Sequence, residues 1–174
     1  PGIKIISPMT PNEYLIAYKD FMKNDDVMYV SEHRGSYSNT KELNDHLDDN
    51  LDLILFPISI TRFEAQKAKI ELEKEGYKIG IANILWIKPF LIKKEWEKAV
   101  TNSKFGGIVL DDDYTDGIAS NLAYQLIKRT NKNFEVMGLK DRSAGFSKTT
   151  DNLPPSYEEI IKKCKEIIHK KGKL

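Results

Sequence analysis

Apolar runs and amphipathic segments alternate along most of the chain. Short apolar runs bounded by polar residues or glycine are typical of buried strands, and they fall at residues 53–58, 77–85, 108–110 and 134–139. Apolar residues recur at helical spacing between them, over residues 61–75, 93–102, 116–129 and from 156 toward the C-terminus. Strands separated by helices of this length predict a mostly parallel sheet with helices on both faces. We therefore expect an α/β fold whose three-layer αβα domain spans residues 50–174.

A shorter strand-helix-strand pattern precedes this domain. Residues 3–6 and 27–30 are its apolar runs. Between them, Thr10, Pro11 and Glu13 are typical of a helix start, with Thr10 as the N-cap and Glu13 three residues later. Residues 36–50 are rich in Ser, Asn and Asp and predict a linker.

Two later helices begin with the same kind of capping signature. Thr61 with Glu64, and Ser156 with Glu159, have the spacing at which a hydroxyl and a carboxylate each accept a backbone N–H. Gly76 is expected to end the first of these helices. The last helix has a clear apolar stripe, formed by Tyr157, Ile160, Ile161, Cys164, Ile167 and Ile168.

Charge and cysteine content narrow the function classes. The 27 basic and 26 acidic side chains give a net charge of +1, which argues against a dedicated nucleic-acid or membrane-surface protein. Cys164 is the single cysteine, so no internal disulfide forms, and a reducing, cytoplasmic setting is expected. The sequence has no apolar run of the roughly 18 to 20 residues that a membrane span needs, and its start does not resemble a signal peptide.

Four short segments, in this order, carry a resemblance to a known family. They are Pro1-Gly2-Ile3-Lys4-Ile5-Ile6-Ser7-Pro8, Ser31-Glu32-His33-Arg34 followed by Tyr37, Leu72-Glu73-Lys74-Glu75-Gly76, and Ile87-Lys88-Pro89. The chain resembles the second half of thiamine diphosphate-dependent subunits. The relatives are transketolase and the beta subunit of the pyruvate or 2-oxoacid dehydrogenase decarboxylase component. The resemblance implies that residues 1–49 are a remnant of the pyrimidine-binding domain with its linker, and that residues 50–174 are a transketolase C-terminal-like domain.

The resemblance also implies an activity for the complete assembly. Family members cleave a bond beside a carbonyl of a ketose or 2-oxo acid, using thiamine diphosphate and magnesium. Their partners would be further copies of this chain, a dimer being expected, and a diphosphate-binding domain or alpha-type subunit. No Gly-Asp-Gly diphosphate motif occurs here, and the family's activating glutamate would lie before Pro1. This chain alone is therefore expected to hold no cofactor and no metal and to lack activity, serving instead in assembly and as one wall of the site. A non-catalytic binding module is the alternative.

Glu32, His33 and Arg34 are the candidate residues at the edge of the active site. They follow a predicted parallel strand, and ligands gather at the carboxyl ends of such strands. His33 has the chemistry to exchange protons with substrate, and Arg34 to hold a carboxylate or phosphate by two hydrogen bonds. The alternative is a solvated strand end at which Glu32 and Arg34 pair with each other.

A second motif favours different chemistry. Asp111-Asp112-Asp113-Tyr114-Thr115 matches the Asp-x-Asp-x-Thr loop of haloacid dehalogenase-like phosphotransferases. In that family the first carboxylate attacks phosphorus and the second works as an acid or base beside magnesium, roles that would fall to Asp111 and Asp113. A magnesium-dependent phosphohydrolase is therefore a third hypothesis. The alternative is a polar loop between a strand and a helix.

Two further expectations concern burial. Cys164 lies on the apolar stripe of the last helix and is expected to be a small core residue, not a nucleophile. The first segment is too short to bury all of its large apolar side chains, and exposed patches of this kind mark interfaces. The side chains concerned are Tyr14, Tyr18, Phe21 and Met22.

Overall fold

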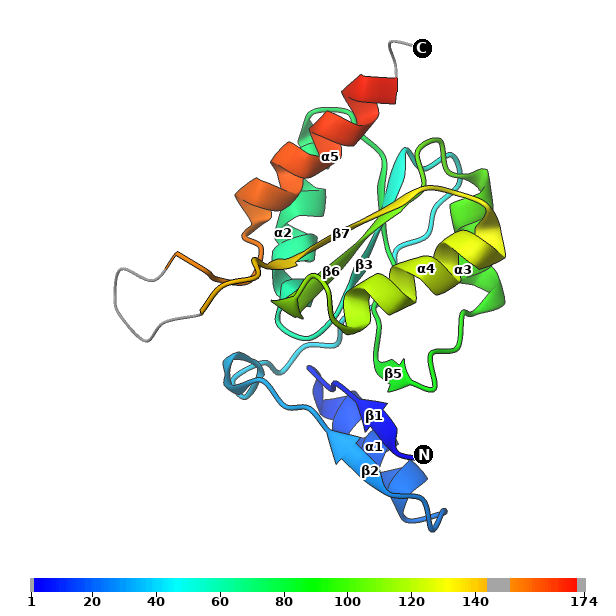
Figure 1. Ribbon diagram of the computed structural model, residues 1–174, viewed down its shortest axis with the longest axis vertical. Helices are drawn as coiled ribbons and strands as arrows, with labels where there is room; N and C mark the ends of the chain where they lie inside the picture. Colours follow the sequence, from blue (N-terminus) through cyan, green and yellow to red (C-terminus); the bar gives the residue numbers. More distant parts are fainter. Residues whose placement is uncertain (1, 144–150, 172–174) are drawn as a thin grey trace.

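The computed structural model describes residues 2–143 and 151–171, and its centre is a four-stranded parallel sheet (Figure 1). The strands are β3 (Leu53–Pro57), β4 (Ile79–Ile81), β6 (Gly107–Tyr114) and β7 (Phe134–Leu139). Their order across the sheet is β4-β3-β6-β7, and every neighbouring pair is parallel. The mostly parallel sheet expected from the sequence is confirmed.

Helices cover both faces of this sheet. Helices α2 (Thr61–Lys74) and α5 (Tyr157–Lys171) lie on one face, and α3 (Lys94–Asn102) and α4 (Ile118–Thr130) on the other (Figure 1). Strand β3 shows why: Leu53 and Leu55 pack with α2 and α5, whereas Ile54 and Phe56 pack with α3 and α4. A strand that is apolar on both sides must be covered on both sides. The expected three-layer αβα domain is therefore present.

The chain changes direction across the sheet between β3 and β6. From β3 it passes through α2 to β4 on one side, and it later enters β6 on the other side before moving outward to β7. The helices that follow β3 and β6 lie on opposite faces of the sheet. The carboxyl ends of these two strands therefore form the topological switch point, where open α/β sheets bind ligands.

A second, three-stranded sheet has the order β2-β1-β5. Strands β1 (Lys4–Ile6) and β2 (Met28–Val30) are parallel and joined through helix α1 (Pro11–Phe21), as the strand-helix-strand pattern predicts. Strand β5 (Trp86–Lys88), which the sequence pattern did not predict, pairs antiparallel with β1. The small sheet thus takes its third strand from a segment about eighty residues after β1.

The first segment lies against the carboxyl ends of the main sheet's strands (Figure 1). Ser7 donates its backbone N–H to the carbonyl of Leu85, 2.9 Å away. The short helix η1 (Arg34–Ser36) meets the β3–α2 turn so closely that a Cβ on Gly35 would lie 2.8 Å from Ile60 Cδ1. The two sheets therefore meet at the end of the main domain where the switch point lies.

Thr10 is the N-cap of α1 and Pro11 its first residue, as predicted, but side-chain capping bonds form at only one of the three predicted helix starts. The hydroxyl of Thr10 donates to Glu42 at 2.5 Å and makes no cap bond, because Glu13 is drawn into an ion pair with Arg62. Thr61 is the first helical residue of α2, not its cap. The third box is confirmed: the Ser156 N–H donates to Glu159 at 2.9 Å, and the Glu159 N–H to Ser156 Oγ at 3.3 Å.

Candidate functional site

His33 lies just beyond the carboxyl end of β2 and caps η1. Its Nδ1 accepts the backbone N–H of Gly35 at 3.0 Å, and its carbonyl accepts the hydroxyl of Ser36 at 2.8 Å. Because Nδ1 acts as an acceptor, the proton of the neutral imidazole lies on Nε2. The ring is therefore held in one tautomer, with Nε2 as the nitrogen that can donate.

Glu32 and Arg34 flank His33 but do not pair with each other. Glu32 accepts the hydroxyl of Tyr37 at 3.0 Å, and this bond raises the pKa of Tyr37. Within the described residues the exposed Arg34 side chain makes no hydrogen bond and no ion pair. An arginine fork without an internal partner is suited to bind a carboxylate or phosphate by two hydrogen bonds.

The switch point of the main sheet holds a second group of polar residues. Ser59, at the end of β3, has a φ of 52°, a left-handed conformation that is uncommon for a residue other than glycine. Its hydroxyl donates to Asp112 Oδ2 at 2.7 Å. The buried hydroxyl of Thr61 donates to the carbonyls of Ile58 at 2.6 Å and Leu110 at 3.2 Å. Side-chain hydrogen bonds thus join the ends of β3 and β6.

Asp111 is buried in this group, with a side chain closed to solvent. Its residue exposure is 2%, and its Oδ1 accepts the N–H of Asp113 at 3.3 Å. Among the residues that the structure describes, none is a hydrogen-bond partner of its Oδ2. Burial first, and then the negative charge of Asp112, raise the pKa of Asp111 to about 7. A buried carboxyl group without compensating donors favours its neutral form.

The three aspartates belong to strand β6, so the predicted loop at this position is wrong. They form a bulge against β7: Leu110 pairs with Met137 and Tyr114 with Leu139, leaving three residues opposite Gly138 alone. A Cβ on Gly138 would lie 2.4 Å from the carbonyl oxygen of Asp113. The glycine makes room for the bulge, and an isolated glycine inside a strand was the sequence signal for it.

The acidic group does not provide a metal centre of the expected kind. Within residues 2–143 and 151–171, no group of three or more His, Cys, Asp or Glu side chains is arranged to hold a metal ion. The Asp113 carboxylate accepts the N–H of Tyr114 at 2.8 Å, and Asp111 is buried. A phosphohydrolase using Asp111 and Asp113 would need an exposed nucleophile beside magnesium, so this arrangement does not favour that hypothesis.

A buried ion pair between the two sheets had no signal in the sequence pattern. The guanidinium of Arg62, fully buried at the start of α2, donates to both carboxylate oxygens of Glu13 in α1, at 2.6 and 2.8 Å. Its Nε donates to Asn83 Oδ1 at 3.1 Å. Glu13 also accepts the backbone N–H of Met9 at 2.9 Å. The pair fixes α1 against the carboxyl ends of the main sheet, beside the candidate residues.

The segment of residues 36–50 is tied to the main domain by Asp45. One carboxylate oxygen accepts the backbone N–H of Asn83 at 2.7 Å. The other accepts the indole N–H of Trp96 at 2.7 Å and the ammonium group of Lys93 at 3.0 Å. These contacts hold the predicted linker in one conformation.

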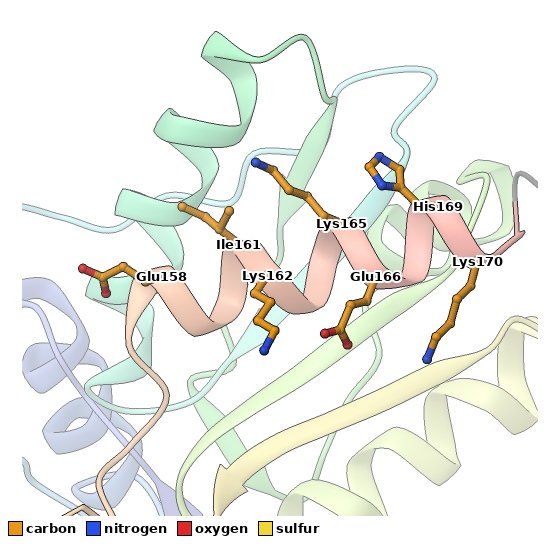
Figure 2. Close-up of a pocket in the computed structure, with 7 residues that line it drawn as sticks. All are labelled: Glu158, Ile161, Lys162, Lys165, Glu166, His169 and Lys170. Atoms are coloured by element: carbon orange, nitrogen blue, oxygen red, sulfur yellow. The ribbon is translucent and has the colours of Figure 1, made fainter.

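A surface hollow of about 590 Å³ runs along α5 (Figure 2). Figure 2 shows Ile161, Lys165 and His169 on one side of the helix and Glu166 and Lys170 on the other. Every lining residue belongs to α5, and the charges are of both signs. Lys165 pairs with Glu75 at 2.6 Å. The hollow therefore has no converging polar groups from a second element, and it lies away from the candidate residues.

Cys164 is fully buried against α2, which confirms its expected place in the core. Burial raises the pKa of its thiol to about 12. The thiolate is the nucleophilic form of cysteine, so this residue is unreactive in the folded chain.

Among the helices described, none is long and apolar enough to cross a membrane.

Comparisons with known proteins support the fold. No family model matches the chain, and neither does a curated protein. Among solved structures, the chain is similar to a split-gene transketolase described as an inactive beta4 tetramer, with a TM-score of 0.73 and 12% sequence identity. The match covers 97% of this chain and 58% of the transketolase chain, so the chain spans less than two thirds of that protein's length. The fold of this chain is thus similar to that of part of the transketolase chain.

Proposed function

We propose that this chain is the C-terminal portion of a thiamine diphosphate-dependent enzyme, similar to transketolase or to a 2-oxoacid dehydrogenase beta subunit. Its role is subunit assembly and one wall of the active site. The observation that carries the proposal is the similarity to a split-gene transketolase over 97% of the chain, which includes both sheets and the turn bearing His33.

Two side chains have the chemistry for the site edge. Arg34 has no partner within the described part of the chain and is free to bind the carboxylate of a 2-oxo acid or the phosphate of a sugar. His33 is fixed by Gly35 with Nε2 available to donate a proton. Glu32 accepts the hydroxyl of Tyr37 and so is already hydrogen-bonded within the segment.

The residues of this chain do not fit thiamine diphosphate or its magnesium ion. The sequence has no Gly-Asp-Gly motif, and the described residues include no metal-binding group of three or more side chains. We therefore assign the cofactor to a diphosphate-binding domain or alpha-type subunit, and no chemical step to this chain alone. Substrate contact at Arg34 and His33 is its contribution to the assembled enzyme.

Calorimetric titration with thiamine diphosphate and magnesium tests the proposal. We expect no micromolar binding by the chain alone, and binding when it is mixed with a diphosphate-binding domain or alpha-type subunit. In the mixture, Arg34→Ala should raise KM for 2-oxo acids or sugar phosphates, and Lys23→Ala, an exposed control, should leave it unchanged. Micromolar cofactor binding by the chain alone would overturn the assignment.

Turnover by the mixed complex also distinguishes the proposed role from the alternative, in which the chain is a non-catalytic assembly module. Such a module would also form the complex, but Arg34→Ala and His33→Ala would leave the turnover of that complex unchanged.

A further inference from the structure

A groove of about 630 Å³ lies between α4 and the connection from β5 to α3. Residues 90–92 form one wall, and the other is formed by Tyr124, Gln125, Lys128 and Arg129 of α4. The groove is on the face of the main sheet that α3 and α4 cover, and α5 lies on the opposite face (Figure 1). Two separate elements therefore converge on this groove, unlike the hollow along α5.

The connection from β5 to α3 presents one apolar side chain outward from a fixed base. Phe90 and Ile92 are half-buried and pack against the core, whereas Leu91 between them is 70% exposed. The ring centroids of Phe90 and Trp96 are 6.4 Å apart, and the Trp96 indole N–H donates to Asp45 at 2.7 Å. This wall is thus held in place before a partner binds, which lowers the entropic cost of binding.

Helix α4 adds an aromatic ring and positive charge to the groove. Tyr124 and Lys128 are four residues apart, so they lie on the same side of the helix. Tyr124 is 60% exposed, and Lys128 is exposed and makes no hydrogen bond or ion pair with any residue that the structure describes. Arg129 pairs with Glu97 at 2.9 Å. Exposed pairs contribute about 1 kcal/mol or less, so a partner's carboxylate can take the place of Glu97.

The charged residues of the groove have one sign. Among the described residues that line it, none is Asp or Glu, and Lys128 is followed directly by Arg129. A partner that fits must therefore bring carboxylates to these two side chains and apolar groups to Leu91 and Tyr124. Aromatic residues and arginine in particular carry much of the binding energy at protein interfaces.

The backbone of the two walls limits the form of the partner. Backbone groups in the middle of an α-helix are hydrogen-bonded within the helix. None of the described strands contributes a residue to the groove, so a partner has no sheet edge to extend here. Recognition must therefore depend on side chains, as when an amphipathic helix lies in a groove. Such a helix presents an apolar stripe with charged residues beside it.

We propose that this groove binds an acidic amphipathic helix of a partner protein. The apolar stripe of that helix packs on Leu91 and Tyr124, and its carboxylates pair with Lys128 and Arg129. None of the three residues at the site edge lines the groove, so this proposal does not rest on the proposed function.

Fluorescence anisotropy with synthetic peptides tests the proposal. The first probe is a labelled peptide of about 15 residues, since shorter isolated helices are marginal in water. It carries leucine along one helical face and glutamate on the other, and a second probe has lysine in place of every glutamate. We expect saturable binding of the acidic probe, and binding of the lysine probe that is weaker by about tenfold or more. Equal affinities, or no saturable binding of the acidic probe, would overturn the proposal.

Charge reversal at Lys128 locates the contact. Lys128→Glu should weaken binding of the acidic probe by about fivefold and strengthen binding of the lysine probe. Lys162→Glu is the matched control, because Lys162 is exposed on α5 and also has no partner among the described residues. It should change neither affinity. The same effect from both variants would mean that the probes respond to net charge alone, and the proposal would fail.

Truncation of the apolar side chains tests the other half of the contact. Leu91→Ala and Tyr124→Ala should each weaken binding of the acidic probe by about fivefold or more, as expected for anchor residues of an interface. Ile70→Ala is the control, because Ile70 is 53% exposed on α2, on the opposite face of the sheet. Unchanged affinity in both Leu91→Ala and Tyr124→Ala would contradict the assigned packing.

Sedimentation velocity of the chain without peptide distinguishes a partner protein from a second copy. If the groove were a contact between copies, Tyr124→Ala would lower the sedimentation coefficient at high concentration, and the proposal would be overturned. We expect wild type and Tyr124→Ala to sediment alike. None of these measurements involves the cofactor, so their failure would leave the proposed function standing.

Discussion

Arg62 and Glu13 form a two-point ion pair, with N–O distances of 2.6 and 2.8 Å, in which the arginine side chain is closed to solvent. The two residues lie in α2 and α1, so the pair joins the main domain to the first segment. The Nε–H group of Arg62 donates a hydrogen bond to Asn83 Oδ1, so this nitrogen also has a partner. The buried ion pair therefore helps to fix the site edge against the main domain, together with the β1–β5 pairing and the Ser7–Leu85 hydrogen bond.

Breaking this pair should destabilise the fold strongly. Glu13→Gln leaves the buried guanidinium without a countercharge, and the free energy of unfolding in urea should fall by about 3 to 5 kcal/mol. Lys67→Met, which removes an exposed pair with Glu64, is the control and should cost less than about 1 kcal/mol. Replacing both members by apolar residues, as in Glu13→Leu with Arg62→Met, should recover much of the loss. Equal effects of Glu13→Gln and Lys67→Met would show that the buried pair contributes little.

Asp111 should make stability depend on pH. Its pKa is about 7 in the folded chain against an ordinary value of 3.8, so the unfolded chain loses this proton first as pH rises. The free energy of unfolding should therefore fall from about pH 4 to pH 7 and then level off, by at most roughly 4 kcal/mol at about 1.4 kcal/mol per pH unit.

Asp111→Asn should remove that slope and leave the protein more stable than the wild type at pH 8. The measurement is urea unfolding at several pH values. Asp113→Asn is the control, because Asp113 is exposed and its change should stay within about 0.5 kcal/mol. A wild-type curve that rises from pH 4 to 7 would show that Asp111 is ionised in the folded chain.

Gly138→Ala should disturb the bulge of β6. The added methyl group would lie 2.4 Å from the Asp113 carbonyl, so one of the two strands must move, at a cost of about 1 to 3 kcal/mol. Gly2→Ala is a suitable control, since a Cβ there meets nothing within 4 Å. Thermal unfolding of both variants measures the difference, and equal melting temperatures would mean that the bulge adapts without strain.

Cys164 should resist thiol reagents until the protein unfolds. Its thiol is fully buried, and its pKa is raised to about 12, so the folded chain presents almost no thiolate at pH 8. Labelling with a disulfide reagent should be slow in buffer and fast in urea. Fast labelling in buffer would show that α5 detaches from α2 under native conditions.

The main domain could be predicted because its elements carry their own patterns. Strand β7 has the bounds that its apolar run predicts, and the Ser156–Glu159 box forms because both partners lie within one turn of helix. Local signals of this kind need no knowledge of the rest of the fold.

The features that the sequence did not reveal depend on distant partners. Strand β5 exists because residues 86–88 meet β1, and Arg62 is buried because Glu13 arrives from another helix. The run of three aspartates has loop-like composition, yet it belongs to a strand because Gly138 of β7 makes room for it. At the site edge, the absence of a Glu32–Arg34 pair follows from the position of Tyr37.

The β1–β5 pairing has a consequence for proteolysis. The peptide crosses from the small sheet to the large one after β2, returns at β5, and crosses again before α3. A single cut within residues 36–50 would therefore not release two independent halves. The severed N-terminal piece would keep its contacts with residues 86–88 and with Arg62, and the nicked protein should run as one particle on gel filtration under native conditions.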